Sequence, residues 1–519
     1  MSREPEPSAA ELFTALYEGD EDAVVRLLRA GLPADTTDGD GQTPLYLTAL
    51  QNDLCAVRLL LAAGAEPERP SGFEGGDLPL CGAAVGGHTE VVRALLAAGA
   101  RPGTPESMGF TAMTWAVRQG YAATVRVLLE HGADPDLPGP QGEPPLVSAV
   151  RRGSPPTVRA LLEHGASAKE AALAEARAQL ALDVGEELRR ELLEPYESEH
   201  ETVSRRVAED GGTTVVVELL RDGRPAAGRE RGCGHAAIAT LLEAELGIRT
   251  PYEELAGRAL GREGRDGRGE PGEPGEPGRP GDREQDNWIE QVRTLWRRGG
   301  EETFQAAVAW CASDDPRRRA FGADVLGHLG VTDGAPPGPF GARAVPVLRE
   351  TAREAVHPEL IRATVLALGH HGDPAALPEI LRHAGHPQAR VRLQVAQALF
   401  GLVPGDHTEG VGALIALSRD GDERIRDWAT TALAVLDTDA PGVREALADR
   451  LDDRDTTTAA EAVAGLAKRQ DPRAIPVLIR ILADEDPKGY ARQTALDAVG
   501  LIEDESLRTR LEGIHPRCR

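Results

Sequence analysis

Aromatic side chains are scarce in this sequence, since Phe, Trp and Tyr together make up 3% of its 519 residues. A large aromatic-lined active site is therefore poorly supported, because ligand pockets are lined mainly by hydrophobic and aromatic groups. Lysine is almost missing as well and occurs only as Lys169, Lys468 and Lys488. We attribute this bias toward arginine to GC-rich bacterial coding. Ala, Leu, Val and Gly dominate instead, which suits helices packed closely through small side chains.

Long apolar stretches are also absent. No run approaches the roughly 18 apolar residues that a membrane span needs, and the N-terminal MSREPEPSAAELF has no apolar secretory core. We therefore expect a cytoplasmic protein that makes no membrane contact. The cysteines form no CxxC pair, so neither a disulfide framework nor a cysteine zinc site is indicated, and we expect no cofactor. They are Cys55, Cys81, Cys233, Cys311 and Cys518.

Basic residues are fewer than acidic residues, so the net charge is −26. Nonspecific binding of nucleic acid depends mostly on electrostatic attraction to phosphates, so a chain this acidic repels them. We therefore expect that nucleic acid is not a partner of the chain as a whole, although local basic patches remain compatible with this charge.

What the sequence does contain is a repeat. Glycines close successive amphipathic helices at intervals of 33, 35, 33 and 33 residues, and a second set of turn residues lies twelve residues before each of them. The closing residues are Gly31, Gly64, Gly99, Gly132 and Gly165, and the opening residues are Gly19, Asn52, Gly87, Gly120 and Gly153. Gly, and to a lesser extent Asn, tolerates the positive φ that such turns require. Repeat periods in this range predict a solenoid.

The wording of these units resembles the ankyrin repeat. Thr43-Pro44-Leu45-Tyr46 nearly spells the TPLH start of that family, and residues 87–100, GHTEVVRALLAAGA, match its GHxEVVxxLLxxGA pattern. The fourth unit departs from the pattern at Ala112 and Thr114, and the fifth departs at Val147. We expect these changes to loosen the starts of the first helices in those units without erasing the fold. The first unit lacks the start of the motif and is expected to form an N-terminal cap.

The resemblance to ankyrin repeats implies helix pairs with projecting loops and protein partners held on the concave side. The positions that match the variable contact sites of the family are Asp40, Gln42, Phe73, Glu74, Asp77, Met108, Phe110, Gln141 and Glu143. Aromatic anchors dominate interface energetics, so Phe73 and Phe110 are the most informative of these positions. Each could be exposed to a partner or could lie beneath its own loop.

The middle of the chain carries one hint of catalysis. Residues 171–193 are helical in pattern and are expected to cover the end of the array, and residues 213–217 with Asp222-Gly223 predict a strand and a turn. The following segment, Gly232-Cys233-Gly234-His235, resembles the nucleophile segment of papain-like double-glycine peptidases. That chemistry needs a His and an Asn or Asp from elsewhere in the fold, so a buried cysteine at a helix start is the competing interpretation.

The last part of the chain predicts a second solenoid. The D-x-x-VR…ALG…GDP…IPxLI wording over roughly residues 313–505 resembles short HEAT-like repeats of the phycobilin-lyase type, and lyase activity does not follow from the repeats alone. The four histidines His370, His371, His383 and His386 lack the ligand spacing of a metal site, so no metal is expected. Arg317, Arg318 and Arg319 are interpreted as an ion-paired helix face rather than a phosphate site.

The predicted fold class is all-α, with two helical-repeat solenoids joined by a small mixed segment and a Gly/Pro-rich linker. The expected domains are 8–168 (about five ankyrin repeats), 169–260 (a helical cap and mixed segment), 261–286 (a disordered collagen-like linker) and 287–515 (HEAT-like repeats). The leading functional hypothesis is a non-enzymatic scaffold that binds protein partners on two concave faces. The alternatives are a cysteine hydrolase centred on Cys233 and a regulator that binds a phosphorylated or nucleic-acid partner through the HEAT-like half.

Overall fold

The computed structural model describes residues 8–72, 76–195, 201–209, 212–261, 285–329, 339–439, 442–484 and 489–514. The chain divides into two compact units, Met1–Gln291 and Val292–Arg519, which are taken separately below. Most of the expected linker, residues 262–284, lies outside the described ranges. Within those ranges, no helix combines the length and the apolarity that crossing a membrane requires.

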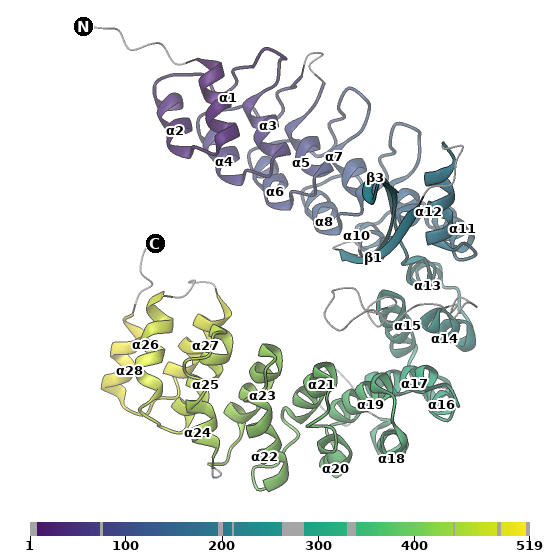
Figure 1. The fold of residues 1–519 in the computed structure, drawn as a ribbon, viewed down its shortest axis with the longest axis vertical. Helices are drawn as coiled ribbons and strands as arrows, with labels where there is room; N and C mark the ends of the chain where they lie inside the picture. Colours follow the sequence, from purple (N-terminus) through teal and green to yellow (C-terminus); the bar gives the residue numbers. More distant parts are fainter. Residues whose placement is uncertain are drawn as a thin grey trace. The chain divides into compact units, whose positions relative to one another are not determined.

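Helix pairs build most of the first unit (Figure 1). The first helices of the pairs are α1 (Ala9–Glu18), α3 (Pro44–Leu50), α5 (Pro79–Val85), α7 (Ala112–Gln119) and α9 (Pro145–Arg152). The second helices are α2 (Glu21–Arg29), α4 (Leu54–Ala62), α6 (Thr89–Ala97), α8 (Ala122–Glu130) and α10 (Pro155–Glu163). Each of α3, α5 and α7 packs against the next first helix along the chain, and α4, α6 and α8 do the same with the second helices. This is the stacking that the repeat period predicted.

The two sets of turn residues have the backbone conformation that the sequence predicted. The five closing glycines have φ between 86° and 100°, and the five opening residues, Asn52 among them, have φ between 61° and 83°. One expectation was wrong. The start of α7 is not loosened by the change at Thr114, because Thr111 and Thr114 form a capping box in which each side chain bonds the backbone N–H of the other.

Two further helices continue the stack beyond the last pair. Helix α11 (Lys169–Gln179) packs against α9, and α13 (His235–Glu245) packs against α11 and α10. A single cluster of buried apolar residues runs from Ala34 to Leu242 through all of these layers. The expected cover over the end of the array is present in α11 but not in residues 184–193, which pack on the sheet described next. Helix α13, more than 50 residues further along the chain than α11, adds another layer to the array.

A small antiparallel sheet lies between α11 and α13 in the sequence. Its strands β1 (Thr202–Glu209), β2 (Gly212–Arg221) and β3 (Arg224–Gly232) have the order β1-β2-β3. Helix α12 (Val184–Leu193) covers one face and buries Leu188 and Leu192 against the β2 valines and Leu219. The predicted strand and the Asp222-Gly223 turn are confirmed, whereas β1 and β3 were not predicted.

Helix pairs also build the second unit (Figure 1). Its helices begin with the second half of α15 (Gln285–Arg298) and continue with α16 (Gly300–Cys311), α17 (Pro316–Leu329), α18 (Gly341–Glu354), α19 (Pro358–His371), a 3-10 turn η1 (Pro374–Ala376), α20 (Leu377–Leu381), α21 (Ala389–Leu399), α22 (Thr408–Leu417), α23 (Glu423–Val435), α24 (Val443–Ala448), α25 (Thr456–Lys468), α26 (Ala474–Asp484), α27 (Tyr490–Val499) and α28 (Glu505–Glu512). The odd-numbered helices α17 to α27 pack in succession.

Glycines in this unit allow neighbouring helices to approach closely. A Cβ built on Gly327 would lie 2.7 Å from the Cα of Ala367, and one on Gly369 would lie 2.8 Å from the Cα of Ala398. Both pairs join successive helices of the α17-α19-α21 row. The Gly of the repeated ALG wording is therefore a packing residue, because any side chain at that position meets the backbone of the next repeat.

We expect Gly369→Ala to destabilise the second unit and Gly412→Ala to stabilise it. Gly412 lies in α22 with open space around it, so alanine there gains about 1 kcal/mol of helix propensity. Alanine at position 369 gains the same helix propensity, but its methyl group overpacks the contact with α21, which costs about 1–3 kcal/mol. Urea unfolding followed by circular dichroism would measure both changes, and equal changes would show that the α19–α21 contact is looser than described.

Candidate interaction surfaces

The first three loops between the helix pairs of the first unit are joined to one another by backbone hydrogen bonds. Ser71 and Asp77 form an antiparallel bridge at the base of one loop. The N–H of Gly72 donates to the carbonyl of Gly41 at 3.0 Å, and the N–H of Ser107 donates to the carbonyl of Gly76 at 3.0 Å. The first three loops therefore form one connected edge, on which the predicted contact positions Asp40, Gln42, Asp77 and Met108 lie.

The structure places seven of the nine predicted contact residues, and Phe73 and Glu74 lie outside the described residues. Asp40, Met108 and Gln141 are exposed, and Met108 is the most open, with 69% of its surface accessible. The half-buried residues are Gln42, Asp77 and Glu143. Glu143 is paired with Arg151. The contact role of these residues remains a prediction. Among them, Met108 has the most accessible side chain.

Phe110 lies beneath its own loop, which is the second of the two alternatives that the sequence left open. It is only 6% exposed and stacks on Trp115, with 4.3 Å between the ring centroids. Trp115 donates its indole N–H to Glu106 at 2.7 Å, which ties the loop to α7. Burial of Glu106, followed by the nearby charge of Asp77, raises the pKa of that carboxyl.

Sequence reasoning did not identify Trp115 and Arg118 as surface residues of interest. The guanidinium carbon of Arg118 lies 5.7 Å from the Phe110 centroid and 5.9 Å from the Trp115 centroid. Arginine over an aromatic face is attracted by the ring quadrupole. Trp115 and Arg118 are three residues apart and therefore lie on one face of their helix. This spacing was the signal in the sequence that could have identified them.

Cys233 lies at the start of α13, beside Thr213, His235 and Asn287. Its thiol donates a hydrogen bond to the carbonyl oxygen of Thr213 at 3.2 Å. The His235 ring is 3% exposed and bonds the backbone of Val150 and Arg151, and burial lowers its pKa to about 4. Asn287 donates to the Cys233 carbonyl and accepts from the Ala237 N–H, so it caps the start of α13.

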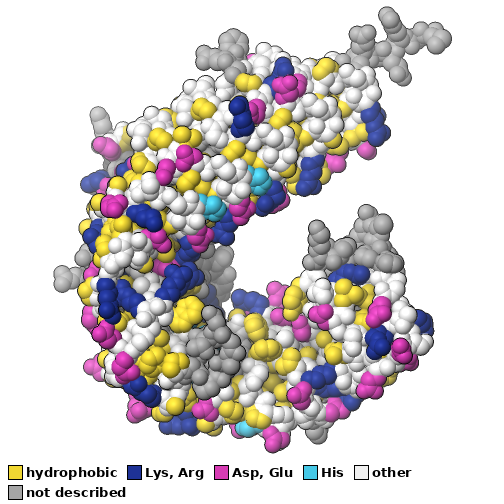
Figure 2. Space-filling view, turned by 180° about the vertical axis from the view of Figure 1, so that it is seen from behind, with side chains coloured by type: hydrophobic (Ala, Val, Ile, Leu, Met, Phe, Trp, Pro, Cys, Tyr) yellow, Lys and Arg dark blue, Asp and Glu magenta, His cyan; other side chains and the backbone are white. Residues whose placement is uncertain are grey.

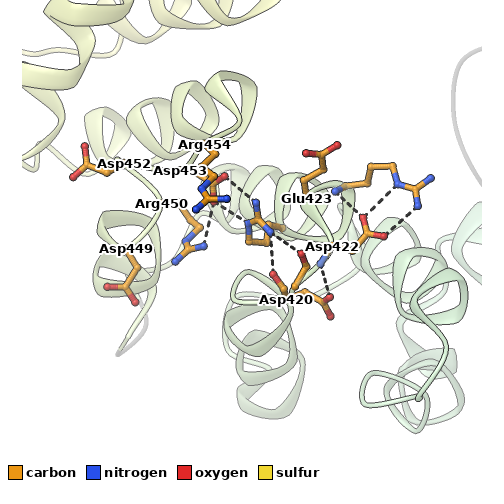
Figure 3. Close-up of a pocket in the computed structure, with 11 residues that line it drawn as sticks. Asp420, Asp422, Glu423, Asp449, Arg450, Asp452, Asp453 and Arg454 are labelled. Atoms are coloured by element: carbon orange, nitrogen blue, oxygen red, sulfur yellow. Dashed lines mark hydrogen bonds and ion pairs between the residues drawn. The ribbon is translucent and has the colours of Figure 1, made fainter. Parts of the chain in front are cut away.

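The second unit contains a cavity of about 920 Å³ lined almost entirely by charged side chains (Figure 3). It lies along the turns before α23 and α25, where six carboxylates and four arginines gather. Asp420 accepts two hydrogen bonds from Arg392, at 2.7 and 3.0 Å, and Asp453 accepts two from Arg426, at 2.9 and 3.0 Å. The hydrogen bond from Arg392 is the main reason that the pKa of Asp420 is lowered.

These arginine–aspartate pairs connect neighbouring repeats. Arg392 lies in the first turn of α21 and Arg426 in the first turn of α23, and each reaches the turn of the following repeat. The corresponding position of the next helix in this row, α25, is Ala459 rather than arginine. Nearby in α23, burial and the charge of Asp455 raise the pKa of Asp427 to about 6. The VR motif in the sequence indicated these repeated arginines, but it did not show which carboxylate each arginine pairs with.

The histidine and arginine clusters of this unit are structural. His371 is 2% exposed and bonds the carbonyl of Leu326 at 3.0 Å, and burial lowers its pKa. Arg319 pairs with Glu354 at 2.7 Å, and Arg317 lies 3.9 Å from Glu359. Over the described ranges, no group of three or more His, Cys, Asp or Glu residues could hold a metal ion.

The stacked helix pairs of both units define a tandem helical-repeat protein. The family described as "Ankyrin repeats (3 copies)" matches residues 12–106 and 80–172, and the family described as "HEAT repeats" matches residues 345–434 and 444–514. The chain therefore carries ankyrin repeats in its N-terminal part and HEAT repeats in its C-terminal part, as both resemblances predicted.

One named relative extends this comparison. The chain is 24% identical to Protein YibA of Escherichia coli (strain K12) over 223 residues, which are 42% of this chain and 76% of the relative. The protein of the same name from Escherichia coli O157:H7 matches with the same values. Both repeat types support a protein-interaction scaffold as the general function.

Proposed function

We propose that this chain is a cytoplasmic bacterial scaffold that binds protein partners on two surfaces. One surface is the loop edge and the concave face of the ankyrin unit, and the other is the concave face of the HEAT unit. The observation that carries the proposal is the combination of two repeat arrays with an accessible loop edge, on which Met108 is 69% exposed. Methionine is enriched at protein interfaces relative to the rest of the surface.

The distribution of charge supports protein rather than nucleic acid as the partner. Figure 2 shows acidic and basic side chains interspersed with hydrophobic ones over the drawn face of each unit. In the HEAT unit, three of the four arginines of the charged cavity are paired with carboxylates: Arg424 with Asp422, and Arg426 and Arg450 with Asp453. A surface of mixed sign does not attract a phosphate backbone over its length.

Site-specific photo-crosslinking in the source cell tests this proposal. A photo-reactive amino acid at Met108, on the loop edge, is expected to capture a discrete protein partner. The same amino acid at Arg126, an exposed position of the second helix α8, is the matched control and is expected to capture none. Equal labelling from the two positions, or no adduct from Met108, would contradict a binding surface on the loop edge.

A further inference from the structure

A second cavity, of about 570 Å³, lies in the first unit and has an unusual excess of arginine for so acidic a chain. It lies where the C-terminal ends of α7 and α9 meet the face of the sheet that is opposite to α12. Four arginines and two glutamates line it, together with Val216 and Gly228. Its volume lies within the range of ligand pockets, about 300–1,000 Å³.

Two of the four arginines are neutralised by the two glutamates. Arg152 donates to Glu230 at 2.9 Å and to the carbonyl of Gln119 at 3.0 Å, and its side chain is only 10% exposed. Arg205 of β1 pairs with Glu218 of β2 at 3.3 Å. These pairs fix one wall of the cavity and show that carboxylates fit beside its arginines.

The third arginine, Arg118, has no carboxylate partner among the residues that the structure describes. Arg229 also borders the cavity, but it pairs in register with Val217, so its side chain lies on the face of the sheet that α12 covers. Arg118 is instead held over Phe110 and Trp115, at 5.7 and 5.9 Å from their centroids. Aromatic stacking orients a guanidinium without cancelling its charge, so its N–H groups remain available for an anion. The cavity therefore carries a net positive charge.

We propose that this cavity binds the carboxylate side chains of an acidic segment of a protein partner. The inference rests on the proposed function, because it names the chemistry of a partner that lies on the ankyrin unit. Arginine forks match carboxylate geometry. A doubly charged phosphate would meet repulsion from Glu218 and Glu230, whereas a singly charged carboxylate meets less. Arg118 lies over Phe110, which ends the loop that carries Met108, so the cavity and that loop share one arginine-aromatic contact.

The test uses the full-length chain and a short fluorescein-labelled Gly/Ser peptide that carries two Glu residues. Fluorescence anisotropy would measure its dissociation constant for the native chain and for Arg118→Ala. Arg126→Ala is the matched control, since it removes one exposed arginine from the same unit without touching the cavity. Free succinate and inorganic phosphate serve as competitors, and peptides with Gln or Lys in place of Glu serve as specificity controls.

We expect Arg118→Ala to weaken binding of the Glu peptide by about tenfold, since a hydrogen bond to a charged group is worth about that factor or more. Arg126→Ala should leave binding unchanged, and the Gln peptide should bind poorly. Equal effects of the two variants, no binding of the Glu peptide, or displacement by phosphate more readily than by succinate would each overturn the inference. None of those results touches the crosslink expected at Met108, which tests the proposed function itself.

Discussion

Gly153→Ala is expected to destabilise the end of the ankyrin array by about 4 kcal/mol, which is a large effect for a single methyl group. Gly153 ends α9 at φ 77°, and a Cβ built there would lie 2.3 Å from the carbonyl oxygen of Gly232. Its own carbonyl accepts the N–H of Gly234 at 3.2 Å. The methyl group would therefore push the end of β3 and the start of α13 away from the array.

Gly19→Ala is the matched control for this prediction. Gly19 ends α1 with the same left-handed geometry, at φ 68°, but no atom lies within 4 Å of a Cβ built there. Alanine at Gly19 therefore pays only the cost of the left-handed conformation, about 1–2 kcal/mol. The difference between the two variants isolates the contact between the array and β3.

Hydrogen exchange measured by mass spectrometry distinguishes the two effects. In Gly153→Ala, the amides of β2, β3 and the first turn of α13 should exchange faster than in the native chain, because these elements are no longer held against α9. In Gly19→Ala, they should keep their protection, while the amides near α1 exchange faster. Unchanged protection of β3 in Gly153→Ala would show that the sheet is not docked on the array.

The same glycine illustrates how much of the fold the sequence could predict. Gly153 belongs to the series of opening residues, so its positive φ and its place between two helices followed from the repeat period alone. Its second role, as the point where Gly232 approaches, depends on a contact between residues 79 positions apart. No local pattern reports such a contact, because periodicity describes one element and its neighbours.

The sheet was predicted in part for a similar reason. Strand β2 buries Val215 and Val217 against α12 and has the run of valines that a strand pattern requires. Strands β1 and β3 are polar and largely exposed, and their backbone pairing with β2 is what fixes them. Polar edge strands carry little hydrophobic alternation, so the sequence gives no signal that distinguishes them from loops.

The interaction surfaces were predicted less completely than the helices. The ankyrin resemblance assigned contact positions by alignment, which located the exposed Met108 but could not establish that Phe110 would lie under Trp115. Arg118, Arg152 and Arg205 come from α7, α9 and β1, and only the folded unit brings them to one cavity. A charge excess in a cavity is a property of tertiary structure, and the net charge of −26 gave the opposite indication.

Glu243→Ala is expected to cost about 3–5 kcal/mol, because it leaves a buried guanidinium without its carboxylate. Glu243 is 1% exposed in α13. It accepts hydrogen bonds from Arg258 at 2.7 and 3.0 Å, from Arg177 at 2.8 Å and from Thr250 at 2.5 Å. Arg177 lies in α11 and Arg258 in α14 (Tyr252–Leu260), so one carboxylate joins three helices at the end of the ankyrin array.

Glu254→Ala serves as the control, since it removes a second carboxylate from the same arginine. Glu254 pairs with Arg258 at 2.7 Å, but its side chain is 51% exposed, and exposed pairs contribute about 0–1 kcal/mol. Thermal unfolding followed by circular dichroism should therefore show a large loss of stability for Glu243→Ala and almost none for Glu254→Ala. Similar losses for the two variants would contradict the burial of the Glu243 network.

The dependence of this difference on pH provides a second, independent test. Burial alone would raise the pKa of Glu243, but hydrogen bonds from Arg258, Thr250 and Arg177 outweigh burial and lower it to about 2. Because the folded-state pKa lies below the unfolded value of about 4.5, the carboxylate stabilises the fold fully above pH 4.5. That contribution, about 3 kcal/mol by linkage, disappears as the pH falls from 4.5 toward 2.

The native chain and Glu243→Ala should accordingly converge in stability over that acidic window. Burial of His235 also weakens the fold as the pH falls, since the pKa of that ring is lowered to about 4 from 6.5. Both chains contain His235, so its contribution cancels in the difference between them. A stability difference that stays constant from pH 6 to pH 2.5 would show that packing, rather than the charge of Glu243, holds α11, α13 and α14 together.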